Sequence, residues 1–375
     1  MGVDIEFSLV LPCLNEEKTI GICIEKAKKV FSQLKVSYEI IVVDNGCKDN
    51  SASIAKKLGA KVVVEPKQGY GNAYLKGFSV TKGNRIIMVD SDNTYDLYEL
   101  PKLIQYSKKY DLVLGKRTYF HKKAMPWLHR TIGNPLLSFI FRLFFKAKIK
   151  DVHSGFRIIK KTAFEKLELN TGGMEFASEM LMKAVKQKIK VKEVLINYYK
   201  RIGKSKLSSF NDGWKHLRFM LLHTPSYLFF IPGFLIFFVG ILGVLFLSTG
   251  DIMINNFRLG IHTAILCSLL AILGFQLIFL TLFAKIYLFA VLKEKSLLIE
   301  RFIQYLTLEK GLFFGSLIFL IGLLISGNIF IRWLLTGFSG FFQPGRVILA
   351  STILIIGIQI IFNVFYLSIL GIEKK

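Results

Sequence analysis

The stretch IIMVDSDN, at residues 86–93, joins a short apolar run to a pair of carboxylates. The run ends at Val89, and Asp90 and Asp92 follow it with one residue between them. Short runs of Ile and Val that end in polar residues are typical of buried strands. Carboxylate oxygens are the hard ligands that Mg²⁺ and Mn²⁺ prefer. Residues 86–93 therefore predict a strand with a divalent-metal site, formed by Asp90 and Asp92, at its carboxyl end.

Similar apolar runs recur in the first 224 residues, about 20 to 30 residues apart, with helical stretches between them. The runs are Phe7–Leu11, Glu39–Val43, Lys61–Val64, Arg85–Val89 and Asp111–Leu114. This alternation predicts βα units and an α/β fold with a mostly parallel sheet flanked by helices. Ligands of such sheets bind beyond the carboxyl ends of the strands. The polar residues directly after each strand are therefore the candidate site residues.

Polar segments follow the first three runs, at residues 12–17, 44–51 and 67–72. Either of the first two is, alone, also compatible with an ordinary turn before a helix, since Asn, Asp, Gly and Ser cap helices. Together they predict a pocket whose carboxylates accept hydrogen bonds from a nucleotide base or ribose. The glycine loop at 67–72 lacks the dinucleotide spacing and follows the wrong strand, which disfavours a Rossmann oxidoreductase.

The second part of the chain has a different composition. Four apolar stretches, each long enough to span a bilayer, lie at Leu228–Leu247, Ile261–Val291, Leu312–Leu335 and Val347–Gly371. They predict two domains, a soluble one over residues 1–224 and an all-α transmembrane bundle of four helices over residues 225–375. The bundle is interpreted as an anchor, and orienting a lipid acceptor or assembling a homo-oligomer remain alternatives.

The formal net charge of +24 favours an anionic partner. Transmembrane segments favour the lipid bilayer or a phosphorylated substrate over nucleic acid. The loop between spans two and three holds four basic residues, against one, Arg258, between spans one and two. This bias predicts a multi-pass protein of the cell membrane with the first domain and both termini in the cytoplasm. No cleavable signal is expected, and the four cysteines form no disulfide or metal pattern.

Two further segments suit helices that lie at the membrane surface, near residues 126–146 and 211–224. Both interleave aromatic and aliphatic residues with Arg and Lys, and the apolar run at residues 136–145 is too short to span. Packing of these helices against the soluble domain is the competing interpretation.

Six ordered motifs then carry a resemblance over about residues 6–224. They are LVLPCLNEE (9–17), VVDNGCKDNS (42–51), MVDSDNTYD (88–96), GKR (115–117), HSGFR (153–157) and RIGKSKL (201–207). The chain resembles the family-2 glycosyltransferases, and within them the dolichol-phosphate mannose or glucose synthases and related polyprenyl-phosphate glycosyltransferases. The resemblance implies a GT-A fold, a UDP- or GDP-sugar donor, a polyprenyl or dolichyl phosphate acceptor, Mg²⁺ or Mn²⁺, and inversion at the anomeric carbon.

The resemblance also implies roles for residues of this sequence. Nucleotide binding falls to Pro12, Asn15, Glu16, Asp44, Lys67 and Asp90, and metal binding to Asp90 and Asp92. Binding of the acceptor phosphate falls to Arg117, Arg130, Arg201, Ser205 and Lys206. The catalytic residues are Asp92, Arg117 and Arg201. Two departures concern the donor sugar and the metal coordination: Thr94 stands where mannose synthases often have Gln, and residues 44–46 read Asp-Asn-Gly.

The chemistry expected of such a site needs no strong general base, because a lipid monophosphate is already an anionic nucleophile. Positioning and charge stabilisation remain, and arginine suits both because its planar fork pairs with phosphate oxygens. Glu175 and Glu179 are candidates for a sugar hydroxyl or simply an acidic helix start. His153 beside Asp151 is interpreted as structural. The alternatives are a processive polysaccharide synthase, whose Gln-x-x-Arg-Trp segment is lacking, and a non-catalytic membrane scaffold or transport partner.

Overall fold

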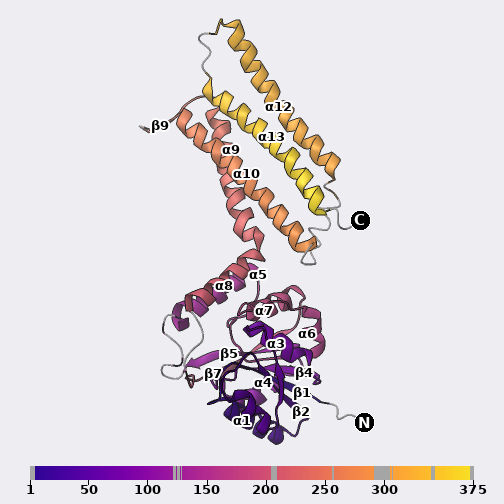
Figure 1. The fold of residues 1–375 in the computed structure, drawn as a ribbon. Helices are drawn as coiled ribbons and strands as arrows, with labels where there is room; N and C mark the ends of the chain where they lie inside the picture. Colours follow the sequence, from indigo (N-terminus) through magenta and orange to yellow (C-terminus); the bar gives the residue numbers. More distant parts are fainter. Residues whose placement is uncertain are drawn as a thin grey trace. The chain divides into compact units, whose positions relative to one another are not determined.

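The computed structural model describes residues 5–120, 124, 127, 129–203, 209–255, 257–290, 305, 307–338 and 343–371. The chain divides into two compact units, Met1–Met220 and Leu221–Lys375, whose elements are labelled in Figure 1. The sequence places the domain boundary between residues 224 and 225.

The first unit is built on a seven-stranded sheet with the strand order β3-β2-β1-β4-β6-β5-β7. The strands are β1 (Phe7–Cys13), β2 (Tyr38–Asp44), β3 (Lys61–Val64), β4 (Arg85–Met88), β5 (Leu112–Phe120), β6 (Arg157–Lys160) and β7 (Val191–Tyr198). Neighbouring strands are parallel except where β6 pairs with β4 and β5. The predicted α/β class with a mostly parallel sheet is therefore confirmed. The five predicted strands are present, and β6 and β7 are additional.

The direction of the strands sets where the functional residues meet. The carboxyl ends of β1 to β5 and β7, and the amino end of the antiparallel β6, lie at one edge of the sheet. The order of the strands reverses between β1 and β4, because β1 continues to β2 and β3 on its other side. A reversal of this kind leaves a crevice at the carboxyl edge, where α/β proteins bind ligands.

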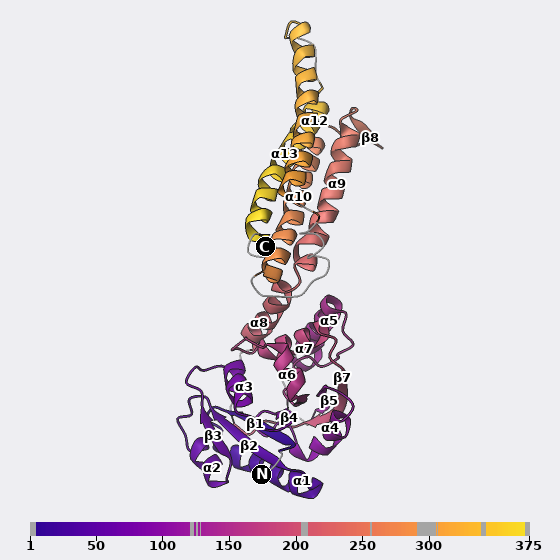
Figure 2. The same cartoon turned by 90° about the vertical axis from the view of Figure 1, so that its right-hand side faces the viewer.

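Alternating side chains of the strands pack into two hydrophobic cores, one on each face of the sheet. Leu9 and Leu11 belong to the first core and Val10 to the second, as the two-residue period of a strand requires. The first core is covered by α1 (Ile20–Leu34), α2 (Ser51–Lys57), η1 (Leu97–Glu99) and α4 (Leu100–Ser107). The second is covered by α3 (Tyr70–Ser79), α5 (Asn134–Phe145), α6 (Lys161–Leu167), α7 (Phe176–Lys186) and α8 (Ser209–Leu222). Figure 2 shows the two helix layers on either side of the sheet.

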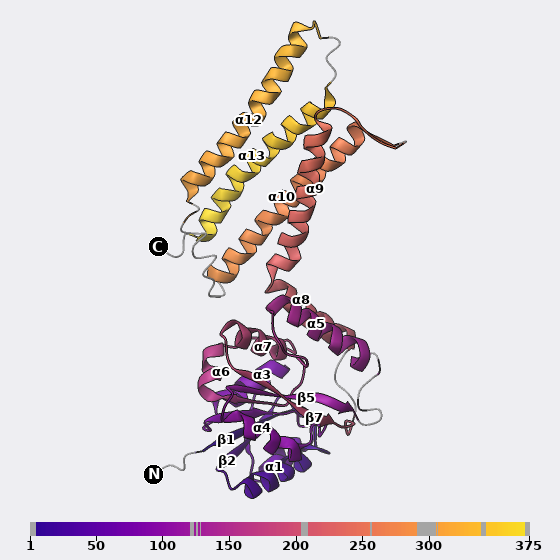
Figure 3. The same cartoon turned by 180° about the vertical axis from the view of Figure 1, so that it is seen from behind.

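The second unit holds four helices long and apolar enough to cross a membrane, Ser226–Leu247, Ile261–Ala290, Leu308–Leu335 and Pro344–Leu370. They comprise η3 (Ser226–Phe230) with α9 (Ile231–Leu247), α10 (Ile261–Ala290), α12 (Leu308–Leu335) and α13 (Pro344–Gly371), with a hairpin of β8 (Ile252–Ile254) and β9 (Phe257–Leu259) before α10. The four predicted spans are confirmed. Helix α9 packs along α10, and α12 along α13, as Figure 3 shows. Gly240 and Gly274 allow the first pair to approach closely, because a Cβ on either would collide with the partner's backbone.

Candidate active site

The carboxyl edge of the sheet brings most of the predicted site residues together. Asn15 and Glu16 follow β1, Asp44 ends β2, and Asp90 and Asp92 follow β4. Three more positions reach the same edge: Arg117 within β5, the segment 151–156 before β6, and Arg201 after β7. Residues separated by as many as 185 positions in the sequence are thus in direct contact.

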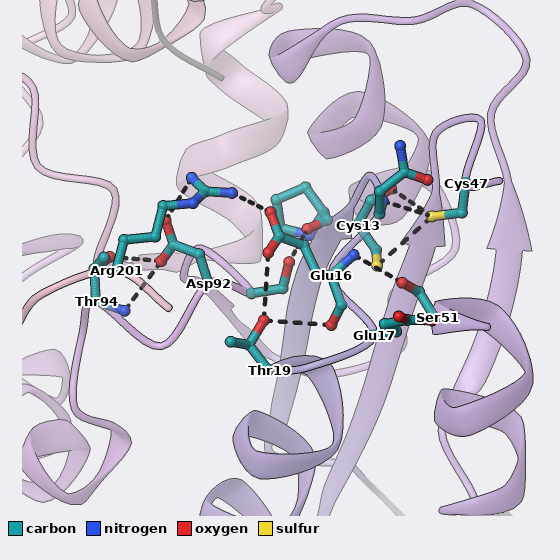
Figure 4. A network of polar contacts seen from close by, with 12 residues as sticks. Cys13, Glu16, Glu17, Thr19, Cys47, Ser51, Asp92, Thr94 and Arg201 are labelled. Carbon is teal, nitrogen blue, oxygen red and sulfur yellow. Dashed lines mark hydrogen bonds and ion pairs between the residues drawn. The ribbon is translucent and has the colours of Figure 1, made fainter. Parts of the chain in front are cut away.

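Arg201 connects the two strand ends at the crevice between β1 and β4. Its guanidinium forms an ion pair with Glu16 Oε1 through Nη2, and its Nη1 lies 2.9 Å from Asp92 Oδ2. Figure 4 shows the guanidinium between the two carboxylates. The arginine side chain is 20% exposed, and its Nε is buried with no hydrogen-bond partner among the residues that the structure describes. Arg201 therefore neutralises two acidic groups that are predicted to hold a nucleotide and a metal.

The protein holds one carboxylate oxygen of Asp90 and both of Asp92, whose Oδ2 meets Arg201. Asp90 Oδ1 accepts hydrogen bonds from the hydroxyls of Tyr70 and Tyr74, at 3.1 and 3.4 Å. Asp92 Oδ1 accepts from the amide and the hydroxyl of Thr94, at 3.0 and 2.6 Å. Thr94, where mannose synthases often have Gln, thus orients Asp92. Within the described part of the chain, Asp90 Oδ2 has no hydrogen-bond partner.

This pair of carboxylates fits a divalent cation that takes its other ligands from phosphate and water. The described residues include no group of three or more His, Cys, Asp or Glu side chains that would hold a metal alone. Burial first, and the charge of Asp92 second, raise the pKa of Asp90 to about 7. A cation favours the ionised form of both groups, and Mg²⁺ sites with few protein carboxylates are common where substrate phosphates complete the shell.

The nucleotide-binding residues predicted at the first two strand ends lie in the last residues of β1 and β2 and in the turn after β1: Pro12, Asn15, Glu16 and Asp44. Asn15 Oδ1 accepts a hydrogen bond from the amide of Lys48 at 2.6 Å, and the amide of Glu16 donates to Ser51 Oγ at 2.8 Å. Cys13 and Cys47 also join these turns, with their sulfur atoms 3.7 Å apart, and all four cysteines are free. The turns are therefore fixed to one another before any ligand binds.

Asn45 fixes the turn after β3 to the same edge. Its Nδ2 donates to the carbonyls of Glu65 and Lys67, at 2.9 and 3.0 Å, and its Oδ1 accepts from the amide of Gly69 at 2.9 Å. The Asn in the Asp-Asn-Gly segment is thus a structural residue that positions the glycine loop. The side chain of Lys67 is exposed, so it is available to an anionic ligand.

Arg117 occupies a different environment. Its Nε and Nη2 donate to the two carboxylate oxygens of Asp151, at 2.8 and 2.7 Å, and its amide donates to Oδ2. Both side chains are nearly buried, 6% exposed for Arg117 and 10% for Asp151. Burial opposes ionisation of Asp151, but the charge and hydrogen bonds of Arg117 outweigh it and hold the pKa of Asp151 below its usual value. Nε and Nη2 of the Arg117 guanidinium thus both bind Asp151.

The segment before β6 carries polar atoms that the sequence did not assign to the site. The hydroxyl of Ser154 and both ring nitrogens of His153 are buried without hydrogen-bond partners. Gly155 follows, and a Cβ there would lie 2.7 Å from Asp90 Oδ2. This segment therefore lies against Asp90, one of the two predicted metal ligands. Among the described side chains of the first unit, every such orphaned atom belongs to His153, Ser154, Glu175 or Arg201. Buried polar atoms without partners are rare in folded proteins, and this group marks a polar ligand site.

The structure describes one of the three remaining predicted acceptor residues. Arg130 is on η2 (His129–Gly133), outside the sheet, with an exposed side chain. Ser205 and Lys206 lie outside the described residues. The HSGFR motif was the available signal for Ser154, but no local pattern pointed to its orphaned hydroxyl.

Comparisons with known proteins agree with the motifs. Residues 8–168 match glycosyl transferase family 2, and residues 282–371 match the glycosyltransferase family 2 C-terminal transmembrane region. The chain is 37% identical over 368 residues to the low-salt glycan biosynthesis hexosyltransferase Agl6 of Haloferax volcanii, covering 97% of this chain and 89% of that protein. It is 28% identical over 211 residues to a dolichyl-phosphate hexose transferase of the same organism, covering 56% and 89%. A solved structure of glucosyl-3-phosphoglycerate synthase from Mycobacterium tuberculosis, with Mn²⁺ and UDP-glucose, has a TM-score of 0.48 at 19% identity, over 59% of this chain and 79% of that one.

Proposed function

The chain belongs to glycosyl transferase family 2 and is a membrane glycosyltransferase with a GT-A type fold, and we propose that it transfers a hexose from a nucleotide-sugar to a polyprenyl phosphate. The product is a lipid-linked sugar, formed with inversion at the anomeric carbon. The contact of Arg201 with Glu16 and Asp92 at the crevice supports this proposal most. The Arg201 guanidinium faces the ends of β1 and β4, where we expect the sugar diphosphate to bind.

The donor half of the site uses the β1–β4 side of the edge. Glu16 and Asp44 are proposed to accept hydrogen bonds from the base and ribose, and the loop at Lys67 is proposed to bind a phosphate. A divalent cation held by Asp90 and Asp92, Mg²⁺ or Mn²⁺, would supply charge neutralisation to the diphosphate leaving group. Tyr70 and Thr94 keep the two carboxylates in position.

The acceptor half requires positioning of an anionic nucleophile rather than proton removal. Arg201 is 20% exposed and has a free Nε, so its guanidinium can exchange a carboxylate for a phosphate oxygen. Such an exchange becomes favourable when a metal ion takes over the charge of Asp92. Ser205 and Lys206 follow Arg201 closely in sequence and are proposed to complete the phosphate site, together with Arg117 and Arg130.

The surface of α5 supports an acceptor that stays in the membrane. Leu136, Phe139 and Leu143 are 52, 54 and 49% exposed and recur at the spacing of one helical face. The opposite face buries Phe141 and Phe145 in the second core. An exposed apolar stripe on a helix rich in basic neighbours suits the headgroup region of a bilayer. Helix α8 shares this character, because Phe219 and Met220 are buried in that core while Trp214 and Leu222 are 51 and 60% exposed.

The protein is a membrane protein with four candidate spans, and we propose that both termini and the catalytic unit are cytoplasmic. The basic residues of the loop between spans two and three support this orientation. A cysteine introduced as Asn255→Cys, in the loop between spans one and two, should react with a membrane-impermeant maleimide in intact cells. The parent protein gives the background. Labelling of residue 255 only after permeabilisation contradicts the orientation.

A transfer assay tests the reaction itself. Purified full-length protein is incubated with radiolabelled UDP- and GDP-hexoses, Mg²⁺ or Mn²⁺, and polyprenyl phosphate. We expect label in the lipid fraction with one donor, dependent on both the metal and the lipid phosphate. Absence of transfer from every donor overturns the proposed function. Elongating saccharide in place of a single transferred sugar supports the processive alternative.

A further inference from the structure

Glu175 has a partly buried carboxylate whose position the fold does not explain. It is the N-cap residue of α7, where a carboxylate usually accepts a hydrogen bond from the first turn of the helix. Here the side chain makes no cap hydrogen bond. One of its oxygens, Oε2, is buried and has no hydrogen-bond partner among the described residues. Leaving a buried acceptor oxygen unpaired is costly, so we expect a ligand to supply the donor.

Two sets of contacts bring the segment of Glu175 close to Asp90, one of the two predicted metal ligands. The amides of Gly71 and Asn72 donate to the carbonyls of Gly173 and Gly172, at 3.2 and 3.1 Å, so the segment before Glu175 packs on the start of α3. The first residue of α3 is Tyr70, whose hydroxyl contacts Asp90. Independently, Phe176 stacks on Tyr74 at 5.8 Å between ring centroids, and Tyr74 also donates to Asp90.

Glycine makes room for the carboxylate. A Cβ on Gly173 would lie 2.9 Å from Oε1 of Glu175 and closer still to Oε2, so the carboxylate lies directly over the Gly173 backbone. Gly172 in turn faces the amide of Asn72. A side chain at Gly173 would push Glu175 out of this position, and the Gly-Gly pair is therefore part of the same arrangement.

We propose that Glu175 binds hydroxyl groups of the donor hexose and selects the sugar, an inference that rests on the proposed transfer reaction. A carboxylate oxygen only accepts hydrogen bonds, so its ligand must donate. The lipid phosphate and the diphosphate offer oxygens that accept. The base and ribose belong to the β1–β2 turns around Asp44. The hexose, attached to the diphosphate beside Asp90, is the component that brings hydroxyl donors to Glu175.

Deleting the carboxylate and the hydroxyl separately and together tests this assignment. Transfer is measured for wild type and Glu175→Ala with UDP-glucose, GDP-mannose and their monodeoxy analogues. We expect one missing hydroxyl to lower wild-type kcat/KM about 10- to 100-fold, as loss of a hydrogen bond to a charged group does. Glu175→Ala should show the same loss with the complete sugar. It should show little further loss with that one analogue, since both changes remove the same contact.

Two further variants serve as controls for the comparison of wild type with Glu175→Ala. Glu165→Ala changes an exposed glutamate of α6 and should behave as wild type. If Glu175→Ala is inactive with all donors, Glu175→Gln, which keeps the shape and one acceptor oxygen, replaces it in the same comparison. The inference is overturned if the variant discriminates against every monodeoxy donor as strongly as wild type does. Failure of the proposed function is a different result, in which wild type transfers no sugar at all.

Discussion

The two sides of the carboxyl edge hold their charges in different ways. On the β1–β4 side, Arg201 is shared between Glu16 and Asp92, is 20% exposed, and has one orphaned nitrogen. On the β5–β7 side, Arg117 is 6% exposed and meets both oxygens of one partner, Asp151. We call the first the open side and the second the closed side.

The two arginines differ in how much their ion pairs contribute to the stability of the fold. Arg117 and Asp151 satisfy each other in a nearly dry environment, and removing either leaves a buried charge without a partner. Arg201 contacts two carboxylates that are also predicted ligands of other groups. Its guanidinium is more exposed than that of Arg117, 20% against 6%, so water screens its ion pairs more and they contribute less to stability. We therefore expect changes on the open side to affect turnover and changes on the closed side to affect folding.

The largest effect is expected for Asp92→Ala on the open side. The substitution removes a metal ligand at a strand end and no core contact, so turnover should fall by about 1000-fold or more, while the midpoint of thermal unfolding changes little. Asp96→Ala, in the same loop but paired with Lys26, is the matched control and should stay active. Chelation by EDTA should abolish the transfer activity of the wild-type protein, and added Mn²⁺ or Mg²⁺ should restore that activity. Wild-type activity of Asp92→Ala would remove the metal assignment.

The next effect is on stability, for Arg117→Ala on the closed side. Loss of the guanidinium leaves Asp151 buried and uncompensated, which typically costs about 3 to 5 kcal/mol. This loss in the free energy of unfolding is measured by denaturant titration of the purified protein, with tyrosine and tryptophan fluorescence as the signal. The double variant Arg117→Ala/Asp151→Ala should be less destabilised than the sum of the single variants. Strictly additive losses would mean that the two groups do not depend on each other.

Arg201→Ala should give the reverse pattern. A bidentate contact to phosphate in a partly desolvated site is worth roughly 2 to 4 kcal/mol, or about 30- to 1000-fold in kcat/KM for the lipid acceptor. The free energy of unfolding should fall by less than it does for Arg117→Ala, because the Arg201 guanidinium is the more exposed of the two. Arg201→Lys should recover only part of the activity, because the ammonium lacks the fork. Lys200→Ala, an exposed neighbour, controls for local charge.

Binding of Mn²⁺ to the free enzyme adds a second readout for the same variant. Without Arg201, Asp92 loses a competing cation, so calorimetry should find tighter Mn²⁺ binding while acceptor use declines. A tenfold loss of donor affinity with unchanged acceptor dependence would instead assign Arg201 to the diphosphate site.

Most residues of the open side were predicted from the sequence, because they follow strands that have a clear apolar pattern. The run before Asp90, and the turns at residues 12–17 and 44–51, are local patterns, and parallel strands bring their carboxyl ends together. The antiparallel strand β6 was not predicted. Its four residues, Arg157–Lys160, are too few for a periodic signal, and only pairing with β4 and β5 defines them.

The closed side depends on contacts that no local pattern encodes. Arg117 and Asp151 are 34 positions apart, and His153 and His216 come from segments 63 positions apart, 216 minus 153. The role of Arg157 was likewise missed. Its guanidinium is fully buried and donates to the carbonyls of Val152, Ser154 and Ala177. Such residues are chosen by the tertiary fold, so a motif match identified HSGFR without indicating what each residue does.

The smallest expected effect is the pH dependence of the closed side, carried by His216 on α8. Burial first lowers the pKa of His216 from 6.5 to about 4, against the nearby Asp212 and aided by Arg157 and Lys215. Its ring lies 4.2 Å from that of His153, and its Nδ1 is 2.9 Å from Ser178 Oγ. Because the folded pKa is below the unfolded one, the unfolded chain takes up the proton first as the pH falls. Stability is therefore complete above about pH 6.5 and is lost between about pH 6.5 and 4, by at most about 3 kcal/mol. His216→Asn keeps a polar group near Nδ1 without a titrating ring. It should make this part of the unfolding profile less steep, while His153, whose pKa burial also lowers well below 6.5, accounts for the remaining slope. An equally steep profile in both proteins would place the acid sensitivity elsewhere.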